Sequence, residues 1–326
     1  RWPGFSCRRS RAELRRDRKR NIIEAPAFRV VINERVCEGC GDCGDKSNCL
    51  SVQPINTPYG RKTRIDQDSC NFDLSCMQGD CPAFMTVTVA ESKGRGGRGG
   101  KKLARKAPPP VVQVPAAPPS VDTDDFTIRM AGIGGTGVVT ISQILGTAAM
   151  LAGYHVRGLD QTGLSQKAGP VVSDLRLSRT RPHASNKATA GSVDVILAFD
   201  QLVAGGDATL RTMTADHTVL VVNTAAIPTG SMVVRPDRPY PAAEIAARLD
   251  DNSDRAVRVD AQRLCVALLG DSGSVNVFML GVAAQAGHIP VDVDYIERAI
   301  TLNGVAVEKN LAAFAWGRAW VADSAA

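Results

Sequence analysis

The chain has 326 residues, of which 44% are hydrophobic, so it is long enough for two domains with at least one sizeable core. It contains no run of about 18 apolar residues, and residues 1–20 lack the apolar stretch of a secretory signal. We therefore expect a cytoplasmic protein without a membrane partner.

The net charge of +6 is spread unevenly along the chain. Residues 1–20 hold nine Lys and Arg against two acids, residues 91–107 hold seven against one, and the remainder is net negative. This pattern is typical of solvated basic segments rather than of a nucleic-acid-binding domain. The glycine and arginine stretch within residues 91–107 leaves an RNA-binding tail as the alternative.

Composition divides the chain into four parts. A basic leading segment (1–27) is followed by a small cysteine-rich module (28–90), a Gly/Arg/Lys and then Pro-rich linker (91–122), and an α/β domain (123–326). The leading segment has no apolar stripe and needs a partner to pack against. The linker cannot bury a core and is expected to be flexible and then extended.

The last part has the pattern of an α/β domain. It opens with an expected strand at 126–131 and a helix at 138–153. Further strands are expected at 154–159, 171–177, which alternates as a half-buried strand does, 193–199 and 218–223. Helices are expected at 275–286, 291–302 and 305–320, with a break at Asn303 and Gly304. Strands separated by helices predict an open, largely parallel sheet with flanking helices.

Seven of the nine cysteines lie between Cys37 and Cys81, a density that predicts metal binding rather than disulfides. Cys37, Cys40 and Cys43 form the C-x2-C-x2-C run of bacterial two-cluster ferredoxins, which gives three ligands to one cluster. The ligand that completes this cluster is expected from the second half of the module, before a proline, and Cys81 precedes Pro82. Structural zinc is the alternative, although zinc sites normally use two cysteine pairs.

The second half departs from the ferredoxin pattern, because Asp73 stands between Cys70 and Cys76 where a cysteine would complete the triplet. We expect a ferredoxin-like module in which Cys37, Cys40, Cys43 and Cys81 hold one 4Fe–4S cluster, and Cys49, Cys70 and Cys76, with Asp73 or solvent at the fourth iron, hold the other. The second cluster should change readily between four-iron and three-iron forms. Four residues separate Cys76 from Cys81 where the ferredoxin run has three, so the alternative for Asp73 is a polar turn residue.

A glycine-rich segment follows the first strand of the α/β domain, and its candidate ligand-binding residues are Gly132, Gly134, Gly135, Thr136 and Gly137. Its N–H groups would face a phosphate at a helix N-terminus, or the glycines only allow close packing. A nicotinamide site needs an acid after the next strand, for which Asp160 is the candidate. The polar loop that follows adds Gln166 and Lys167 as candidates, at the carboxyl end of a strand.

Taken together, the VCEGCGDC module, the GIGGTGVVT turn and the LDQTGLSQKAGPVVSDLRLS segment resemble the indolepyruvate ferredoxin oxidoreductase family of 2-oxoacid:ferredoxin oxidoreductases. The resemblance runs over residues 15–320, interrupted by the linker. It implies oxidative decarboxylation of an aryl 2-oxo acid with coenzyme A on thiamine diphosphate and magnesium. Electrons would pass singly through the clusters to an external ferredoxin, and the α/β domain would be of the gamma type.

The resemblance is incomplete, because no GDG…N signature of a thiamine diphosphate site occurs in these residues. We therefore expect a fragment or subunit that is inactive as a decarboxylase without a separate thiamine-binding region, within a homo-oligomer. The alternative function is a stand-alone iron–sulfur electron-transfer protein with an NAD(P) or flavin site.

Overall fold

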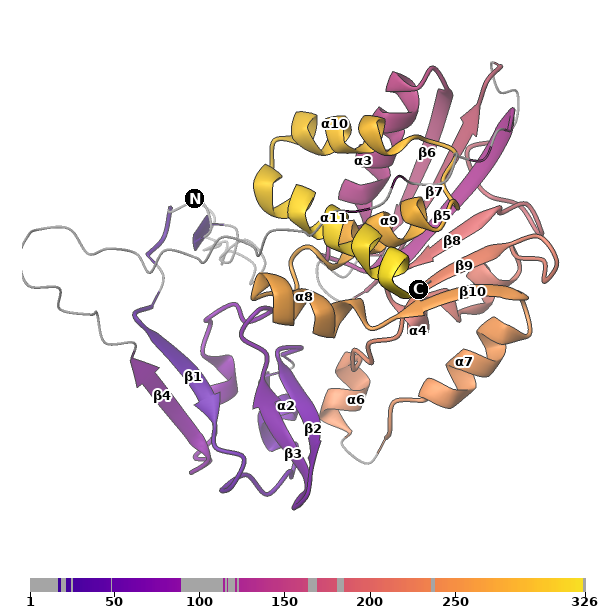
Figure 1. The fold of residues 1–326 in the computed structure, drawn as a ribbon. Coiled ribbons are helices and arrows are strands. Elements are labelled where there is room, and N and C mark those ends of the chain that lie inside the picture. The colour runs from indigo at the N-terminus through magenta and orange to yellow at the C-terminus, as the bar shows by residue number, and fades with distance from the viewer. Residues whose placement is uncertain are drawn as a thin grey trace, which may run out of the picture. The chain divides into compact units, whose positions relative to one another are not determined.

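The computed structural model describes residues 17–18, 22–24, 26–47, 49–88, 114, 116, 121, 123–163, 169–180, 185–235 and 238–324 (Figure 1). Its contacts divide the chain into two units. The cysteine unit comprises Arg1–Lys106 with Pro228–Tyr240, and the sheet unit comprises Ala107–Ile227 with Pro241–Ala326. No helix in the described ranges is both long and apolar enough to cross a membrane.

The cysteine unit is built on two antiparallel strand pairs. Strand β1 (Phe28–Ile32) pairs with β4 (Phe84–Thr88), and β2 (Val52–Thr57) forms a hairpin with β3 (Gly60–Ile65). The helix α2 (Asp42–Ser47) and the short 3-10 helix η1 (Ser75–Met77) contact each other. Val30, Ile32, Ile65 and Ala83 form a small core with the buried Cys37, against which Cys43, Cys70, Cys76 and Cys81 pack.

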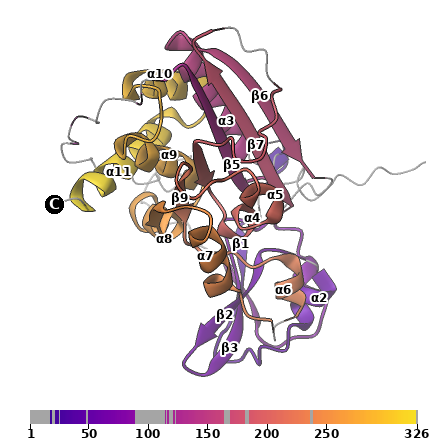
Figure 2. The same ribbon diagram turned by 90° about the vertical axis from the view of Figure 1, so that its right-hand side faces the viewer.

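A short helix from the α/β sequence completes the cysteine unit. Helix α6 (Gly230–Val234) contacts α2 and β2, and Figure 2 shows it beside both. The sequence boundaries placed residues 123–326 in one domain, whereas residues 228–240 pack with the cysteine unit. Composition does not predict this packing, because it joins residues far apart in the sequence, such as Arg61 and Met232.

The sheet unit contains six strands in the order β10-β9-β8-β5-β7-β6. They are β5 (Asp125–Ile133), β6 (His155–Thr162), β7 (Pro170–Ser178), β8 (Val195–Ala198), β9 (Val219–Asn223) and β10 (Arg255–Val259). Strands β10, β9, β8 and β5 are parallel, and β7 is antiparallel to both of its neighbours. The expectation of a largely parallel α/β sheet is confirmed. Strand β10 was not expected, because arginines interrupt its short apolar pattern.

Strand β7 differs from its expected character. Residues 171–177 were predicted to be half-buried, but β7 lies between β5 and β6 and most of it is buried. Arg129 of β5 forms a bidentate ion pair with Asp174, its register partner on β7, with Nε–Oδ1 and Nη2–Oδ2 distances of 2.7 and 2.8 Å. Both side chains are buried. An ion pair fixed across two strands opposes any shift in their register.

Helices of the sheet unit are α3 (Val138–Leu151), α4 (Gln201–Ala204), α5 (Asp207–Leu210), α7 (Ala242–Asp250), α8 (Ala261–Leu269), α9 (Val275–Gln285), α10 (Val293–Asn303) and α11 (Val307–Ser324). The predicted strands and helices of this region are confirmed within a few residues. The Asn303–Gly304 break is also confirmed, since Gly304 ends α10 in the left-handed conformation. Beside the sheet, α9 contacts α3 and α11, and α10 contacts the same two helices (Figure 1).

Candidate metal centre

The seven cysteines of the cysteine unit fall into two spatial groups. The thiol of Cys43 lies within electrostatic reach of Cys37, Cys40 and Cys81, and the thiol of Cys76 lies within reach of Cys49, Cys70 and Asp73. These are the two sets that the spacing assigns to two clusters. Iron binding by either set stays a prediction.

In each group, one thiol lies in a place that disfavours its ionised form. Burial, followed by the charge of nearby cysteines, raises the pKa of Cys43 and raises the pKa of Cys76 to about 12. Thiolates are the ligands that metals require, and cations bound to them reverse this penalty. A site of this kind suits thiolates that are bound to iron cations better than it suits ionised thiols without a metal.

The first loop (residues 37–43) and the second loop (residues 70–76) share a backbone conformation. In both, the residues on either side of the middle position have positive φ, at Gly39 (73°) and Gly41 (84°) and at Phe72 (55°) and Leu74 (60°). Residues other than glycine avoid this region, so their surroundings must impose it on the second loop. Asp73 thus takes the backbone position that Cys40 has in the first loop.

The same backbone donor points at sulfur in both loops. The N–H of Gly39 donates to Sγ of Cys37 at 3.3 Å, and the N–H of Phe72 donates to Sγ of Cys70 at 3.4 Å. Hydrogen bonds to ligand sulfurs favour the thiolate and tune cluster potentials. This repeat was not visible in the letters of the sequence, because glycines in one loop correspond to Phe72 and Leu74 in the other.

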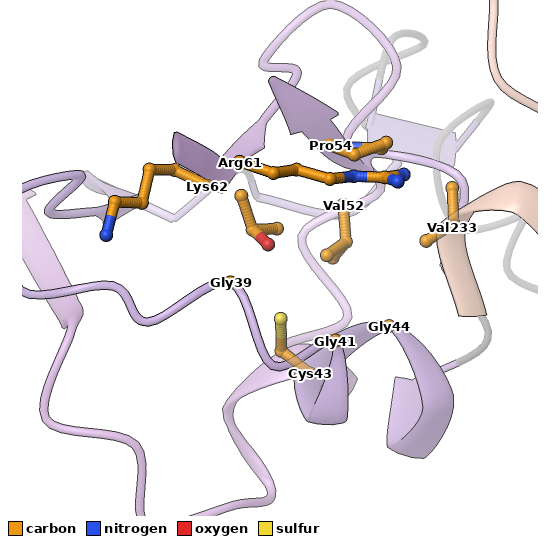
Figure 3. A pocket seen from close by; sticks show the side chains of 10 residues that line it. Gly39, Gly41, Cys43, Gly44, Val52, Pro54, Arg61, Lys62 and Val233 are labelled. Carbon is orange, nitrogen blue, oxygen red and sulfur yellow. The ribbon is translucent and has the colours of Figure 1, made fainter. Parts of the chain in front are cut away.

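The hairpin supports the first loop directly. A Cβ on Gly39 would lie 2.2 Å from the carbonyl oxygen of Arg61, so only glycine fits. The ammonium group of Lys62 donates to the carbonyl of Cys37 at 2.6 Å. Figure 3 shows the sulfur of Cys43 pointing from α2 into a pocket between the first loop and the hairpin. Sequence reasoning did not single out Arg61 and Lys62, because these two cationic residues lie side by side in a polar strand.

Asp73 also has a local role in its turn. Its Oδ1 accepts hydrogen bonds from the backbone N–H of Ser75 at 3.2 Å and from the Ser75 hydroxyl at 2.9 Å. Both the ligand and the turn interpretation of Asp73 therefore keep a structural basis.

Two arginines contact the second loop near Asp73. Arg18 donates to the carbonyl of Asn71, and the Arg29 guanidinium lies 4.5 Å from the centre of the Phe72 ring.

No three His, Cys, Asp or Glu side chains in the described ranges converge to hold a metal ion. A four-iron cluster is bound differently, with one cysteine on each iron, so its ligands surround a volume rather than meet at one point.

The glycine-rich turn is explained largely by packing. A Cβ on Gly132 would lie 2.8 Å from Cγ2 of Val138 and 3.1 Å from Cβ of Phe199. The N–H of Thr136 donates to the carbonyl of Ile133 at 3.2 Å and closes a four-residue turn. Gly135 stands at the third position of this turn with a φ of 85°, which favours glycine. Phosphate binding by this turn stays a prediction.

The acid expected for a nicotinamide site does not lie on the strand next to the turn. Strand β7 separates β5 from β6, and the Asp160 carboxylate on β6 accepts a hydrogen bond from the Ser173 hydroxyl of β7 at 2.6 Å. Dinucleotide-binding folds place the acid on the adjacent parallel strand. Gln166 and Lys167 lie outside the described residues.

Asp200, which sequence reasoning did not single out, is the most unusual carboxylate of the sheet unit. It follows β8, is 2% exposed, and its Oδ1 accepts from the Val203 N–H at 2.9 Å at the start of α4. Its Oδ2 is buried with no hydrogen-bond partner among the described residues, and burial raises the pKa of Asp200 to about 6. The sequence signal was an aspartate between a buried strand and a short helix.

Comparison with known proteins places the sheet unit in a family. The pyruvate ferredoxin/flavodoxin oxidoreductase family matches residues 127–320. Indolepyruvate oxidoreductase subunit IorB of Methanothermobacter thermautotrophicus is 27% identical over 205 residues, which are 61% of this chain and 100% of that protein. The pyruvate/ketoisovalerate oxidoreductases common subunit gamma of Pyrococcus furiosus is 28% identical over 186 residues, which are 56% of this chain and 90% of that protein.

Among solved structures, pyruvate oxidoreductase subunit PORC of Thermotoga maritima matches with a TM-score of 0.44 and 20% identity, covering 61% of this chain and 97% of that one. The family match spans more than half of the chain and leaves residues 28–90 outside it. The chain belongs to the pyruvate ferredoxin/flavodoxin oxidoreductase family, as its resemblance to the gamma-type domain had indicated.

Proposed function

We propose that this chain is the electron-transfer and gamma portion of an oxidoreductase that decarboxylates an aryl 2-oxo acid with coenzyme A and delivers the electrons to ferredoxin. The observation that carries the proposal is the presence of two cysteine groups in the same chain as a sheet unit of this family. The names of its relatives, indolepyruvate oxidoreductase among them, support a 2-oxo acid substrate.

The overall reaction requires one-electron carriers. A 2-oxo acid, coenzyme A and two oxidised ferredoxins would give an acyl-coenzyme A, carbon dioxide, two reduced ferredoxins and a proton. Two electrons leave the substrate, whereas each ferredoxin accepts one. Iron–sulfur clusters supply such one-electron couples when bound, and thiamine diphosphate on a separate region would supply the decarboxylation chemistry.

The residues of this chain would hold and tune the clusters. Cys37, Cys40, Cys43 and Cys81 would ligate one cluster, and Cys49, Cys70 and Cys76 with Asp73 the other. The N–H groups of Gly39 and Phe72 donate to ligand sulfur and would stabilise the thiolate form. Lys62 holds the carbonyl of Cys37 and places a positive charge beside the first loop.

Metal content tests the proposal. Anaerobically purified protein is expected to contain about eight irons with matching sulfide. Cys43→Ser and Cys76→Ser should each disturb one cluster and leave the electron paramagnetic resonance signal of the other intact. Cys265→Ala, which changes a fully buried cysteine in the sheet unit, is the matched control and should keep the parent's iron. Stoichiometric zinc without iron or sulfide would show that the proposal is wrong.

A stand-alone electron-transfer protein with a dinucleotide site is the second candidate. The glycine-rich turn after β5 favours it, and the position of β7 between β5 and β6 weighs against it. Titration of the full chain with NADH, NADPH and flavin nucleotides separates the two functions. Only the second candidate predicts tight, saturable binding.

A further inference from the structure

Helix α6 lies directly on the part of α2 that carries Cys43. A Cβ on Gly44 would lie 2.9 Å from Cγ1 of Val233 and 3.1 Å from the Val233 carbonyl oxygen. Val233 is 5% exposed, which is low for a residue in a helix of so few turns. The two helices therefore meet without space for a water molecule at this point.

A hydrogen bond also joins α6 to the hairpin of the cysteine unit. The guanidinium group of Arg61 donates to the carbonyl of Met232 at 3.4 Å. Gly230 at the start of α6 lies beside Leu50, since a Cβ built on this glycine would be 3.6 Å from Cδ2 of Leu50. Val233 and Cys43 line the same pocket between the first loop and the hairpin (Figure 3). Val233 therefore forms part of the wall on the Cys43 side of that pocket.

The wall matters because reduction adds negative charge to a cluster. Water and other polar surroundings stabilise that charge, whereas an apolar wall does not. Solvent exposure is accordingly one of the properties that set cluster potentials. A valine that excludes water beside a ligand cysteine would make the reduced form less favourable.

We propose that helix α6, with Val233 against α2, is a solvent shield that lowers the reduction potential of the cluster expected at Cys37, Cys40, Cys43 and Cys81. This inference rests on the proposed function, because it requires that cluster to be present. It assigns a tuning role to a helix that lies within the family-matched residues 127–320 but packs in the cysteine unit.

The test compares reduction potentials of the full, anaerobically purified chain by titration followed with electron paramagnetic resonance. Val233→Ala should admit water and raise the reduction potential of the cluster assigned to Cys43. We expect a rise of up to about 59 mV, which for one electron is a tenfold change in the ratio of reduced to oxidised cluster. The potential of the other cluster should stay unchanged. Val266→Ala is the matched control, since this valine is 45% exposed on α8 of the sheet unit.

Two further variants keep the test decisive. Val233→Thr preserves the shape of the side chain and adds a hydroxyl, so it should raise the same potential even if Val233→Ala loses its fold. In the double variant Gly44→Ala/Val233→Ala, the new methyl group of residue 44 on α2 fills part of the space that the valine methyl groups occupied. This double variant should recover part of the parent's potential.

The outcomes separate this inference from the proposed function. If the parent holds about eight irons and Val233→Ala and Val233→Thr keep its potentials, the shield is disproved and the clusters remain. If the parent holds no iron or sulfide, the proposed function itself fails.

Discussion

Asp73 has the backbone position of a predicted cluster ligand and also accepts hydrogen bonds within its own turn. Its backbone position matches that of Cys40, between two residues with positive φ. Its Oδ1 also accepts two hydrogen bonds from Ser75. A carboxylate is a harder ligand than a thiolate and suits cluster iron less well. The residue is therefore the point at which the two cysteine loops differ most in chemistry.

Exchange of Asp73 for cysteine tests its ligand role. Asp73→Cys should keep the second cluster in its four-iron form and suppress the three-iron signal after exposure to air, because thiolate binds iron more firmly. Asp73→Ala should increase that signal. Electron paramagnetic resonance of each variant before and after air exposure measures both effects.

Asp80→Ala removes an exposed carboxylate from the same segment and serves as the control for Asp73. If both Asp73 variants oxidise as the parent does, Asp73 is a turn residue that supports Ser75, and another group holds the fourth iron.

Asp200 should make the sheet unit less stable as pH rises. Burial raises its pKa to about 6, so between its ordinary pKa and this value the folded state binds more protons than the unfolded state. Stability is then highest below the ordinary pKa and falls until the pH passes about 6, by at most about 3 kcal/mol. Asp200→Asn keeps an N-cap side chain and should remove this dependence.

Urea unfolding at several pH values, followed by the fluorescence of Trp316 and Trp320 in a Trp2→Phe background, measures the effect. Both tryptophans pack against the core of the sheet unit. Asp260→Asn alters the N-cap of α8, whose carboxylate is partly exposed, and should keep the parent's pH profile. A parent whose stability is constant between pH 4 and pH 7 would contradict the prediction.

At the scale of elements, α9 and α11 of the sheet unit pack closely against each other. A Cβ on Gly281 would lie 2.1 Å from the carbonyl oxygen of Phe314, and a Cβ on Gly317 would lie 2.0 Å from that of Phe278. The helices therefore touch backbone to backbone at two glycines. Every residue of α9 is buried, so the crossing lies in the core.

Gly281→Ala should separate these helices. Because the added methyl group would meet a rigid backbone atom, we expect a loss of about 3 kcal/mol or more in the free energy of unfolding. Gly146→Ala in α3 is the matched control, since its Cβ would make ordinary contacts at 3.5 and 3.7 Å with Val156 and Leu175. That variant should gain about 0.5 to 1 kcal/mol from helix propensity. Equal stabilities for the two variants would show that the crossing is looser than described.

At the scale of the whole molecule, the chain combines a cysteine unit with a sheet unit of known family but holds no GDG…N signature. Decarboxylation in the proposed reaction would therefore depend on residues outside this chain. The contribution of this chain would be to accept electrons and release them singly.

The purified chain alone should not reduce ferredoxin with indolepyruvate and coenzyme A. Addition of a thiamine-binding subunit with thiamine diphosphate and magnesium should start the reaction, which anaerobic spectroscopy of ferredoxin reduction measures. A preparation with Cys43→Ser should not be restored in this way, because its electron path is interrupted. Turnover by the chain alone would mean that it contains a catalytic site of another kind.

Local spacing in the sequence was sufficient to predict the grouping of the cysteines and the order of strands and helices. The cysteine triplet, the extra carboxylate at Asp73 and the succession of strands and helices depend on residues that are near in sequence, and periodicity records them directly. The α/β class and the Asn303–Gly304 break followed from such signals and are confirmed. The two cysteine sets were expected from spacing, while the binding of iron by them stays a prediction.

Tertiary structure alone decided what depends on distant partners. The Arg129–Asp174 pair joins β5 to β7, and β6 lies at the edge beyond β7, an order that no pattern within either strand specifies. The packing of Val233 against Gly44 joins residues far apart in sequence, and the burial of Asp200 arises from elements on several sides. Such contacts depend on which surfaces meet after folding, and a side chain's own neighbours in sequence do not encode its burial.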